Sequence, residues 1–197
     1  MTKHAGIIVY PQAEELDFVG PLEALGGMAR ISPGWRVVTI AESSPVECTH
    51  GLKVNVDHTF ADAPPLDVLL VPGGIGTRQE VENPRMIDFV RKAGSAASFV
   101  TSVCTGAFIL HRAGFLAGRR ATTHWGSIDR LRELDGVEVV NERFVQDGNV
   151  ITAAGVSAGI DMALYLVSLL TDPQTARNVQ KMMEYYPQPP VFAEAPA

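Results

Sequence analysis

The chain has 197 residues, of which 46% are hydrophobic and 19% charged, and its formal net charge is -6 at pH 7. This length allows one domain with a substantial core, and the composition is that of a globular rather than a disordered protein. We therefore predict a single domain over residues 1–197. The negative net charge offers no basic surface to phosphate groups, which argues against nucleic acid and anionic membranes as partners.

The cysteine count and the apolar segments indicate where the protein resides. Cys48 and Cys104 can form at most one disulfide, which excludes a disulfide scaffold and a thiolate zinc site and suits a reducing compartment. The N-terminal "MTKHAGIIVYPQ" has no signal-peptide pattern, and "VSAGIDMALYLVSLL" carries Asp161 and is too short to span a bilayer. We expect a soluble cytoplasmic protein that spans no membrane.

The first third of the chain alternates strand and helix patterns. "AGIIVY" is an apolar run typical of a buried strand, stopped by Pro11. Apolar residues then recur at helical spacing, which predicts a helix from about residues 15–17 to Gly26 and Gly27. Pro21 either kinks this helix or marks its first turn. Two more strands are predicted at 35–42 ("WRVVTIAE") and 52–57 ("LKVNVD").

The middle of the chain repeats this alternation. "DVLLVPGG" is a buried strand that breaks at Pro72 into a pair of glycines, and Asn83-Pro84 starts a helix that runs to Gly94. "ASFVTSV" is a central strand, and "TGAFILHRAG" is a helix closed by Gly114.

The last third contains shorter strands and two helices. "ATTHW" and "VEVVNERFVQDGNVITAAG" predict strands with a hairpin turn at Asp147-Gly148. Ser157 is placed to cap a helix that ends near Leu170, and Asp172-Pro173 starts another that reaches Tyr186, while the tail 187–197 is not helical throughout. The alternation predicts an α/β three-layer sandwich in which helices flank a mostly parallel central sheet.

Cys104 lies where a buried strand changes to a helix, in "FVTSVCTGAFI". On such a turn the first free amides of the helix and its dipole stabilise negative charge, so we expect a lowered thiol pKa and a nucleophilic sulfur, as in a nucleophile elbow. The alternative is a small buried core cysteine, which is our interpretation of Cys48.

A second strand end adds a possible anion site. Sites in open α/β sheets lie beyond the carboxyl ends of the strands, where Cys104 and the Gly73-Gly74 pair both occur. If these strands are neighbours, the amides of Gly74 and Thr105 can form an oxyanion pocket around the group that the sulfur attacks. No spacing of histidines or cysteines, phosphate-binding loop or dinucleotide motif is present, so we predict no metal and no cofactor.

The sequence resembles the DJ-1/PfpI superfamily, whose fold is flavodoxin-like and shared with class I glutamine amidotransferases. The resemblance rests on "DFVGPLEAL", "DVLLVPGG", "SVCTGAFIL", "GRRATTHW" and "AAGVSAGIDMALYLV", spread over almost the whole chain. Asp17, the Cys104-Thr105 pair and the late "EYYPQPP" are most similar to the isonitrile hydratase branch of that superfamily.

This resemblance implies a reaction and roles for individual residues. The expected activity is hydration of an isonitrile to an N-substituted formamide, with Cys104 as the nucleophile, Asp17 as general acid and base, and Thr105 assisting. Without the resemblance, Asp17 is explained as an acidic residue in the first turn of a helix. The residues expected to bind substrate are Gly74, Ile75, His124 and Trp125. The alternative for His124, which the residues themselves favour, is a hydrogen-bonded histidine at a strand end.

Departures from the superfamily narrow the alternatives. Thr105 stands where superfamily proteases have histidine, and Asp17 stands where the DJ-1 branch has glutamate. Other relatives carry an AraC-type DNA-binding module after this domain, for which the chain has no segment. The open alternatives are a glyoxalase-like or amide-hydrolysing thiol enzyme and a redox-sensing regulator without enzymatic activity. The resemblance also implies a homodimer.

Overall fold

The structure, a computed structural model, describes residues 2–187. Seven strands form one sheet in the order β10-β11-β7-β6-β1-β2-β5, and every neighbouring pair is parallel except β10 and β11. The predicted mostly parallel sheet is therefore confirmed. The strands of this sheet are β1 (Lys3–Ile8), β2 (Trp35–Ala41), β5 (His58–Thr59), β6 (Val68–Val71), β7 (Phe99–Val103), β10 (Phe144–Asp147) and β11 (Val150–Ala153).

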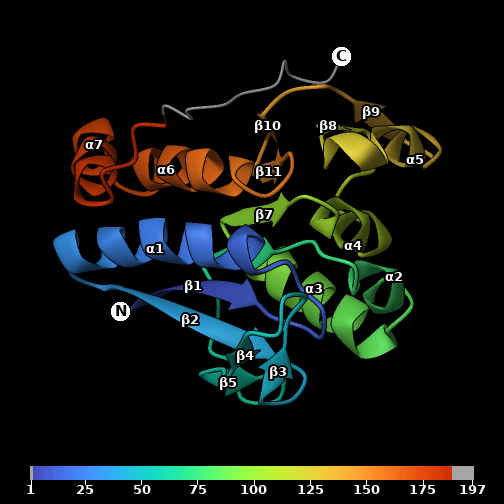
Figure 1. Ribbon diagram of the computed structural model, residues 1–197, viewed down its shortest axis with the longest axis horizontal. Coiled ribbons are helices and arrows are strands. Elements are labelled where there is room, and N and C mark those ends of the chain that lie inside the picture. Colours follow the sequence, from blue (N-terminus) through green and yellow to red (C-terminus); the bar gives the residue numbers. More distant parts are fainter. Residues whose placement is uncertain (1, 188–197) are drawn as a thin grey trace.

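Helices cover both faces of the sheet, as the three-layer prediction requires (Figure 1). On one face α1 (Glu15–Ile31), α6 (Ala158–Leu170) and α7 (Pro173–Met182) pack against one another. On the other face lie α2 (Thr77–Glu80), α3 (Pro84–Ala96) and α4 (Gly106–Arg112). The remaining elements are β3 (Val46–Glu47), β4 (Lys53–Val54), β8 (Arg119–Ala121), β9 (Val137–Val139), the 3-10 helix η1 (Trp125–Ser127) and α5 (Ile128–Arg132).

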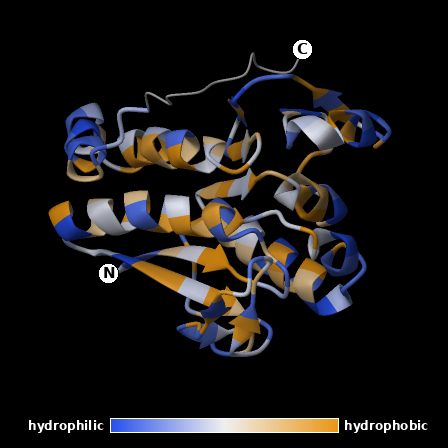
Figure 2. Cartoon of the chain, in the orientation of Figure 1, coloured by the Kyte–Doolittle hydropathy of each residue, from blue (hydrophilic) through white to orange (hydrophobic). Residues whose placement is uncertain are grey.

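The central strands are buried on both sides. All four residues of β6 and all four of β11 are buried, as is usual for parallel strands covered by helices on both faces. Figure 2 shows the same distribution, with hydrophobic colour concentrated on the inner strands and mixed colour on the outer helices. The core thus forms a rigid base for the loops at the carboxyl ends of β1, β6, β7 and β11.

Helix α1 does not end at Gly26 and Gly27, as the sequence predicted, but continues to Ile31. Glycine in this helix serves packing: a Cβ on Gly27 would lie 3.1 Å from Cγ1 of Val179, on α7. The close approach of the covering helices offsets the low helix propensity of glycine. Pro21 lies inside the helix, so its interpretation as a first-turn residue was also wrong.

Other boundaries shifted in smaller ways. The predicted strand 52–57 is reduced to Lys53–Val54, and α7 ends at Met182 rather than at Tyr186. Ser157 is the N-cap of α6 but makes no capping hydrogen bond with its side chain. The side-chain caps at Asn83 and Asp172 and the hairpin between β10 and β11 are confirmed. The tail beyond residue 187 lies outside the described residues.

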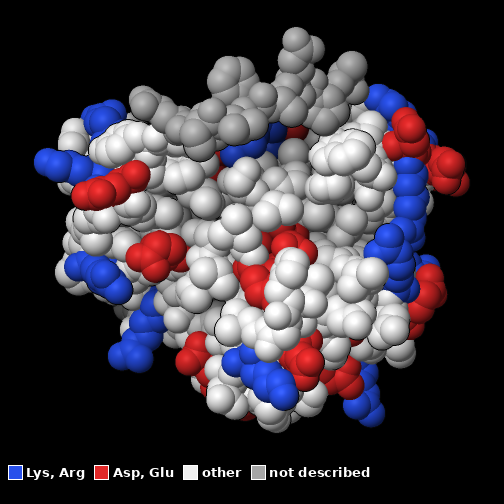
Figure 3. Space-filling model, viewed as in Figure 1, with Lys and Arg blue, Asp and Glu red and all other residues white. Residues whose placement is uncertain are grey.

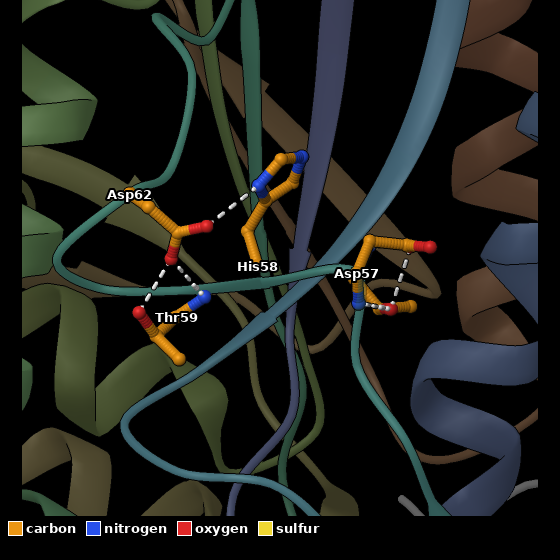
Figure 4. A network of polar contacts seen from close by, with 5 residues as sticks. Asp57, His58, Thr59 and Asp62 are labelled. Atoms are coloured by element: carbon orange, nitrogen blue, oxygen red, sulfur yellow. Dashed lines mark hydrogen bonds and ion pairs between the residues drawn. The ribbon is translucent and has the colours of Figure 1, made fainter.

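The short edge strand β5 is fixed by polar contacts (Figure 4). Asp57 accepts hydrogen bonds from the amide and the hydroxyl of Thr39, both at 2.8 Å. Asp62 accepts one from the Thr59 amide at 2.8 Å and contacts the ring of His58 at 3.3 Å. These contacts replace the regular strand pairing that the sequence predicted through residue 57.

On the face in Figure 3, acidic residues lie in the middle as well as at the edges, basic residues are scattered, and no broad basic area appears. Within residues 2–187, no helix combines the length and the apolar character needed to cross a membrane.

Candidate active site

Cys104 occupies a sharp turn between β7 and α4, as the sequence predicted. Its φ is +56°, a left-handed conformation that few non-glycine residues adopt. Its amide lies 3.0 Å and 2.9 Å from the carbonyl oxygens of Ala153 and Ala154, and its carbonyl oxygen accepts a hydrogen bond of 2.7 Å from the Thr123 hydroxyl. Contacts from two other segments therefore hold the strained residue in place.

Gly106 lets α4 start directly against the end of β6. A Cβ on Gly106 would lie 2.7 Å from the carbonyl oxygen of Pro72 and closer still to that of Val71. We expect Gly106→Ala to destabilise the fold by about 1–3 kcal/mol, measured by urea unfolding, because backbone must move. Gly26→Ala is the matched control: no atom lies within 4 Å of its added Cβ, so it should stabilise α1 by roughly 0.5–1 kcal/mol. Equal effects of the two variants would contradict this account of the elbow.

The loops after β1 and β6 are joined backbone to backbone. Ala13 and Gly74 form an antiparallel bridge, and the Glu14 amide donates to the Gly73 carbonyl at 3.0 Å. Gly74 has a φ of +125°, and a Cβ there would collide with the backbone of Glu14. This junction places the first turn of α1, which carries Asp17, beside the end of β6. Because β6 and β7 are neighbours, the condition set for the oxyanion pocket is met, and the same junction lies beside Cys104.

Asp17 is fully buried in this junction. Its Oδ2 accepts a hydrogen bond of 2.9 Å from the Gly73 amide, whereas its Oδ1 makes no hydrogen bond of ordinary geometry with the described residues. Burial raises the pKa of Asp17 to about 7, helped by the charge of Glu14, while the Gly73 amide, the Cys104 thiol and the Val156 amide oppose the rise. The side chain is poised to hold or release a proton near neutral pH.

The pKa of the Cys104 thiol contradicts the expectation of a lowered value. Burial raises it to about 12, and the negative charge of Asp17 adds to this effect. The amide and the hydroxyl of Thr105 do lower the pKa, as predicted for the start of a helix, but the burial of a 7% exposed cysteine outweighs them. Two acids so close in a buried site cannot both ionise, so Asp17 and Cys104 share at least one proton at neutral pH.

Thr105 and Gly74 lie together, but their two amides do not form the predicted oxyanion pocket, because both amides already have partners. The Gly74 amide donates to Thr105 Oγ1 at 3.1 Å, while the Thr105 amide acts on the sulfur of Cys104. A Cβ on the adjacent Gly73 would lie 2.7 Å from Thr105 Oγ1 and 2.8 Å from Asp17 Oδ2. Gly73 thus leaves the space in which the acid and the hydroxyl approach the sulfur.

A cavity of about 430 Å³ opens next to the elbow. Its lining residues are His124, Trp125, Asn141, Glu142, Arg143, Ala154, Gly155 and Val156. Neither Cys104 nor Asp17 lines it, and it adjoins the elbow through Ala154, whose carbonyl oxygen accepts a hydrogen bond from the Cys104 amide. His124 Nδ1 accepts a hydrogen bond from the Gly126 amide, which assigns the proton of the neutral ring to Nε2. Trp125 is 64% exposed and forms an outer wall. Ile75, also predicted to bind substrate, is exposed beside Gly74 and does not line this cavity.

One group of side chains within the described residues could offer three metal ligands: Glu14, Glu15 and His50. His50 already uses its amide and its ring Nδ1 to contact Glu15, at 2.6 Å and 2.7 Å. This contact keeps the pKa of His50 above its ordinary value and ties the loop at 48–51 to the start of α1.

Several residues around the sulfur were not anticipated from the sequence. Thr123 and Val156 hold the elbow and the acid, and Val156 has a φ of +46°. Tyr10 and Thr77 form a hydrogen-bonded chain behind Thr105. These four residues lie in apolar runs or loops whose sequence pattern is explained by packing. Only the neighbouring Gly73-Gly74 pair indicated a site in this region.

The fold and the site define an α/β protein with a buried cysteine and acid at the carboxyl edge of a parallel sheet. The model of the DJ-1/PfpI family matches residues 3–169, and the chain belongs to that family. The resemblance inferred from its motifs is confirmed.

Two similar proteins carry names of different kinds, one an enzyme and the other a transcriptional regulator. The chain is 39% identical, over 198 residues, to the isonitrile hydratase of Pseudomonas putida, covering 100% of this chain and 84% of that protein. It is 31% identical to the HTH-type transcriptional regulator CdhR of Pseudomonas aeruginosa, covering 92% of this chain but only 54% of the regulator. The crystal structure of a ThiJ/PfpI family protein from Pseudomonas syringae superimposes with a TM-score of 0.92 at 36% identity, covering 99% and 80% of the two chains.

Proposed function

We propose that this protein hydrates isonitriles to N-substituted formamides, with Cys104 as nucleophile and Asp17 as proton carrier. The observation that carries the proposal is the Asp17 carboxyl, which is buried beside the Cys104 sulfur and acts on its pKa, and whose Oδ1 makes no hydrogen bond of ordinary geometry with the described residues. The similarity of the whole of this chain to an isonitrile hydratase, of which it covers 84%, supports the same assignment.

The first step adds the thiol across the terminal carbon of the isonitrile. Sulfur bonds to that carbon while the ionised Asp17 takes the thiol proton and delivers it to the same carbon, giving a thioimidate, R–N=CH–S–Cys104. A free thiolate is not required, so a thiol with a raised pKa is compatible with this step. An acid with a pKa about 7 can exchange the proton in either direction at neutral pH.

The second step consumes one water. Asp17 takes a proton from water as the oxygen attacks the thioimidate carbon and passes it to the nitrogen, giving R–NH–CH(OH)–S–Cys104. Asp17 then takes the remaining hydroxyl proton. The tetrahedral species then breaks its C–S bond, releasing R–NH–CHO and returning the proton to sulfur. Developing charge on the sulfur is stabilised by the Thr105 amide, and by the Thr105 hydroxyl when its proton turns toward the sulfur.

The cavity beside the elbow is the proposed site of the substituent R, with His124 and Trp125 as its aromatic wall. We expect Trp125→Ala to raise KM for cyclohexyl isonitrile about tenfold, because aromatic contact area is lost, with little change in kcat. A small alkyl isonitrile that does not reach the wall serves as the internal control, and its KM should change less than twofold. Steady-state kinetics on both substrates would reject this placement if the two KM values rose together.

The proposal is tested by incubating the purified protein with cyclohexyl isonitrile and following N-cyclohexylformamide by chromatography. Catalytic formation of the formamide supports the assignment, and its absence with an intact Cys104 overturns it. Methylglyoxal and a simple amide are assayed in parallel, because glyoxalase-like and amidase activities use the same thiol. A redox sensor is disfavoured by the burial of Cys104, since oxidation favours exposed thiolates.

We also propose a homodimer that acts in the cytoplasm, on the basis of the family resemblance. Sedimentation velocity at micromolar concentration measures the assembly directly, and a monomer at that concentration would contradict it.

A further inference from the structure

We propose that Tyr10 and Thr77 are positioning residues, which direct the hydroxyl proton of Thr105 away from the Cys104 sulfur in the resting protein. The inference concerns the reactivity of the sulfur, and it rests on the proposed function only in calling that sulfur the nucleophile. The hydroxyls of Tyr10, Thr77 and Thr105 form a continuous chain that ends at the elbow: Tyr10 Oη to Thr77 Oγ1 is 3.0 Å, and Thr77 Oγ1 to Thr105 Oγ1 is 2.9 Å.

Counting protons fixes the direction of this chain. The single hydroxyl proton of Tyr10 is donated to the Pro72 carbonyl oxygen at 2.7 Å, because a carbonyl only accepts. Thr77 must therefore donate its own proton to Tyr10. Having no second proton, Thr77 accepts from Thr105.

The surroundings leave the chain little freedom. Tyr10 is 2% exposed and Thr77 is 3% exposed, so water cannot easily replace either partner. The Gly74 amide donates to Thr105 Oγ1 at 3.1 Å, which occupies one of its lone pairs. The Gly74 carbonyl, 3.2 Å from the same oxygen, is a second acceptor that also draws the proton away from sulfur.

The consequence is a competition for one proton. The Thr105 hydroxyl can donate either to Thr77 or to a negatively charged Cys104 sulfur, but not fully to both. While Thr77 accepts the hydroxyl proton of Thr105, a Cys104 thiolate would lack this hydrogen-bond donor. Cys104 therefore keeps its own thiol proton. The sulfur then stays a thiol until substrate and Asp17 remove that proton together. The chain thus limits side reactions of the resting nucleophile.

The test measures alkylation of Cys104 by iodoacetamide as a function of pH in a Cys48→Ser background, which needs no isonitrile. Removing the Thr77 hydroxyl with Thr77→Val leaves only the more distant Gly74 carbonyl to compete with the sulfur for the Thr105 proton. Alkylation at pH 7 should therefore become faster, by up to about tenfold, within the usual strength of a hydrogen bond to a charged group. The profile should move to lower pH. Thr77→Ser keeps the hydroxyl and should retain the parent profile.

Two further variants separate this role from a merely structural one. Tyr10→Phe lets Thr77 donate to Thr105 instead, so it should move the alkylation profile in the same direction as Thr77→Val. In a Thr105→Val background, Thr77→Val should have no further effect, because the competing proton is gone. An unchanged profile in both Thr77→Val and Tyr10→Phe, or an equal shift in Thr77→Ser, would overturn the proposal. Failure of formamide production alone would overturn the proposed function and leave this result standing.

Discussion

Cys104→Ser is expected to lower the rate of formamide formation by at least about 10³-fold, while the far-ultraviolet circular dichroism spectrum and the unfolding midpoint stay close to those of the parent. Serine keeps the size of the side chain and the left-handed backbone of the elbow. Its hydroxyl is a far weaker nucleophile and gives no readily expelled thiolate in the second step. The measurement is product formation from cyclohexyl isonitrile under saturating substrate.

Cys48→Ser is the matched control for this experiment. Cys48 is also buried, at 4% exposed, and burial raises the pKa of its thiol to about 11. It lies near Glu15 in the loop after β3 and has no place in the proposed reaction, so the variant should keep the parent rate within about twofold. If Cys104→Ser retained more than a tenth of the parent rate, sulfur would not be the attacking atom.

Asp17→Asn is expected to lower the rate by about 10²–10⁴-fold, because an amide can neither take the thiol proton nor deliver one. The same substitution should change stability in a pH-dependent way. The pKa of Asp17 is about 7 in the folded protein against 3.8 for the free group, so the folded state holds the proton more tightly than the unfolded state between these values. The stability that Asp17 contributes is therefore full below pH 4 and is lost as the pH rises to 7.

The variant does not titrate, so its stability relative to the parent should increase from pH 4 to pH 7 and then level off. The increase is at most about 4 kcal/mol, from a shift of roughly three pKa units. Urea unfolding at pH 4, 6 and 8 measures it, and the pH trend cancels any constant effect of the amide on packing. A relative stability that fell with increasing pH would show that Asp17 is ionised more easily when folded.

The sequence predicted those parts of the site that follow directly from a strand end. "SVCTGAF" and "DVLLVPGG" each join a buried run to small residues, and parallel neighbours must bring such ends to one edge. The elbow could therefore be expected from local pattern alone. Asp17 could not, because an acidic residue in a first helical turn has an ordinary explanation, and its burial depends on the backbone junction between Ala13 and Gly74.

The sequence could not predict the pKa of the Cys104 thiol, because that pKa depends on a balance of opposing effects. Helix amides at Cys104 were expected to lower the thiol pKa, and the Thr105 amide does so, but the depth of burial and the charge of Asp17 arise only from the assembled fold. The same limit explains the error in α1. Gly27 predicts a helix end because glycine has a low helix propensity. In the fold, its missing side chain leaves room for Val179 of α7 to pack against α1.

The contacts that hold Cys104 in its left-handed turn come from residues much later in the chain. Its carbonyl oxygen is fixed by Thr123 and its amide by the end of β11, at Ala153 and Ala154. In a chain emerging from the ribosome, the contacts that hold the Cys104 amide can form only after about fifty further residues have been made and β11 can pair with β7. Formation of the elbow is thereby tied to completion of the sheet, and a prematurely terminated product that ends before β11 lacks the two carbonyls that hold the Cys104 amide.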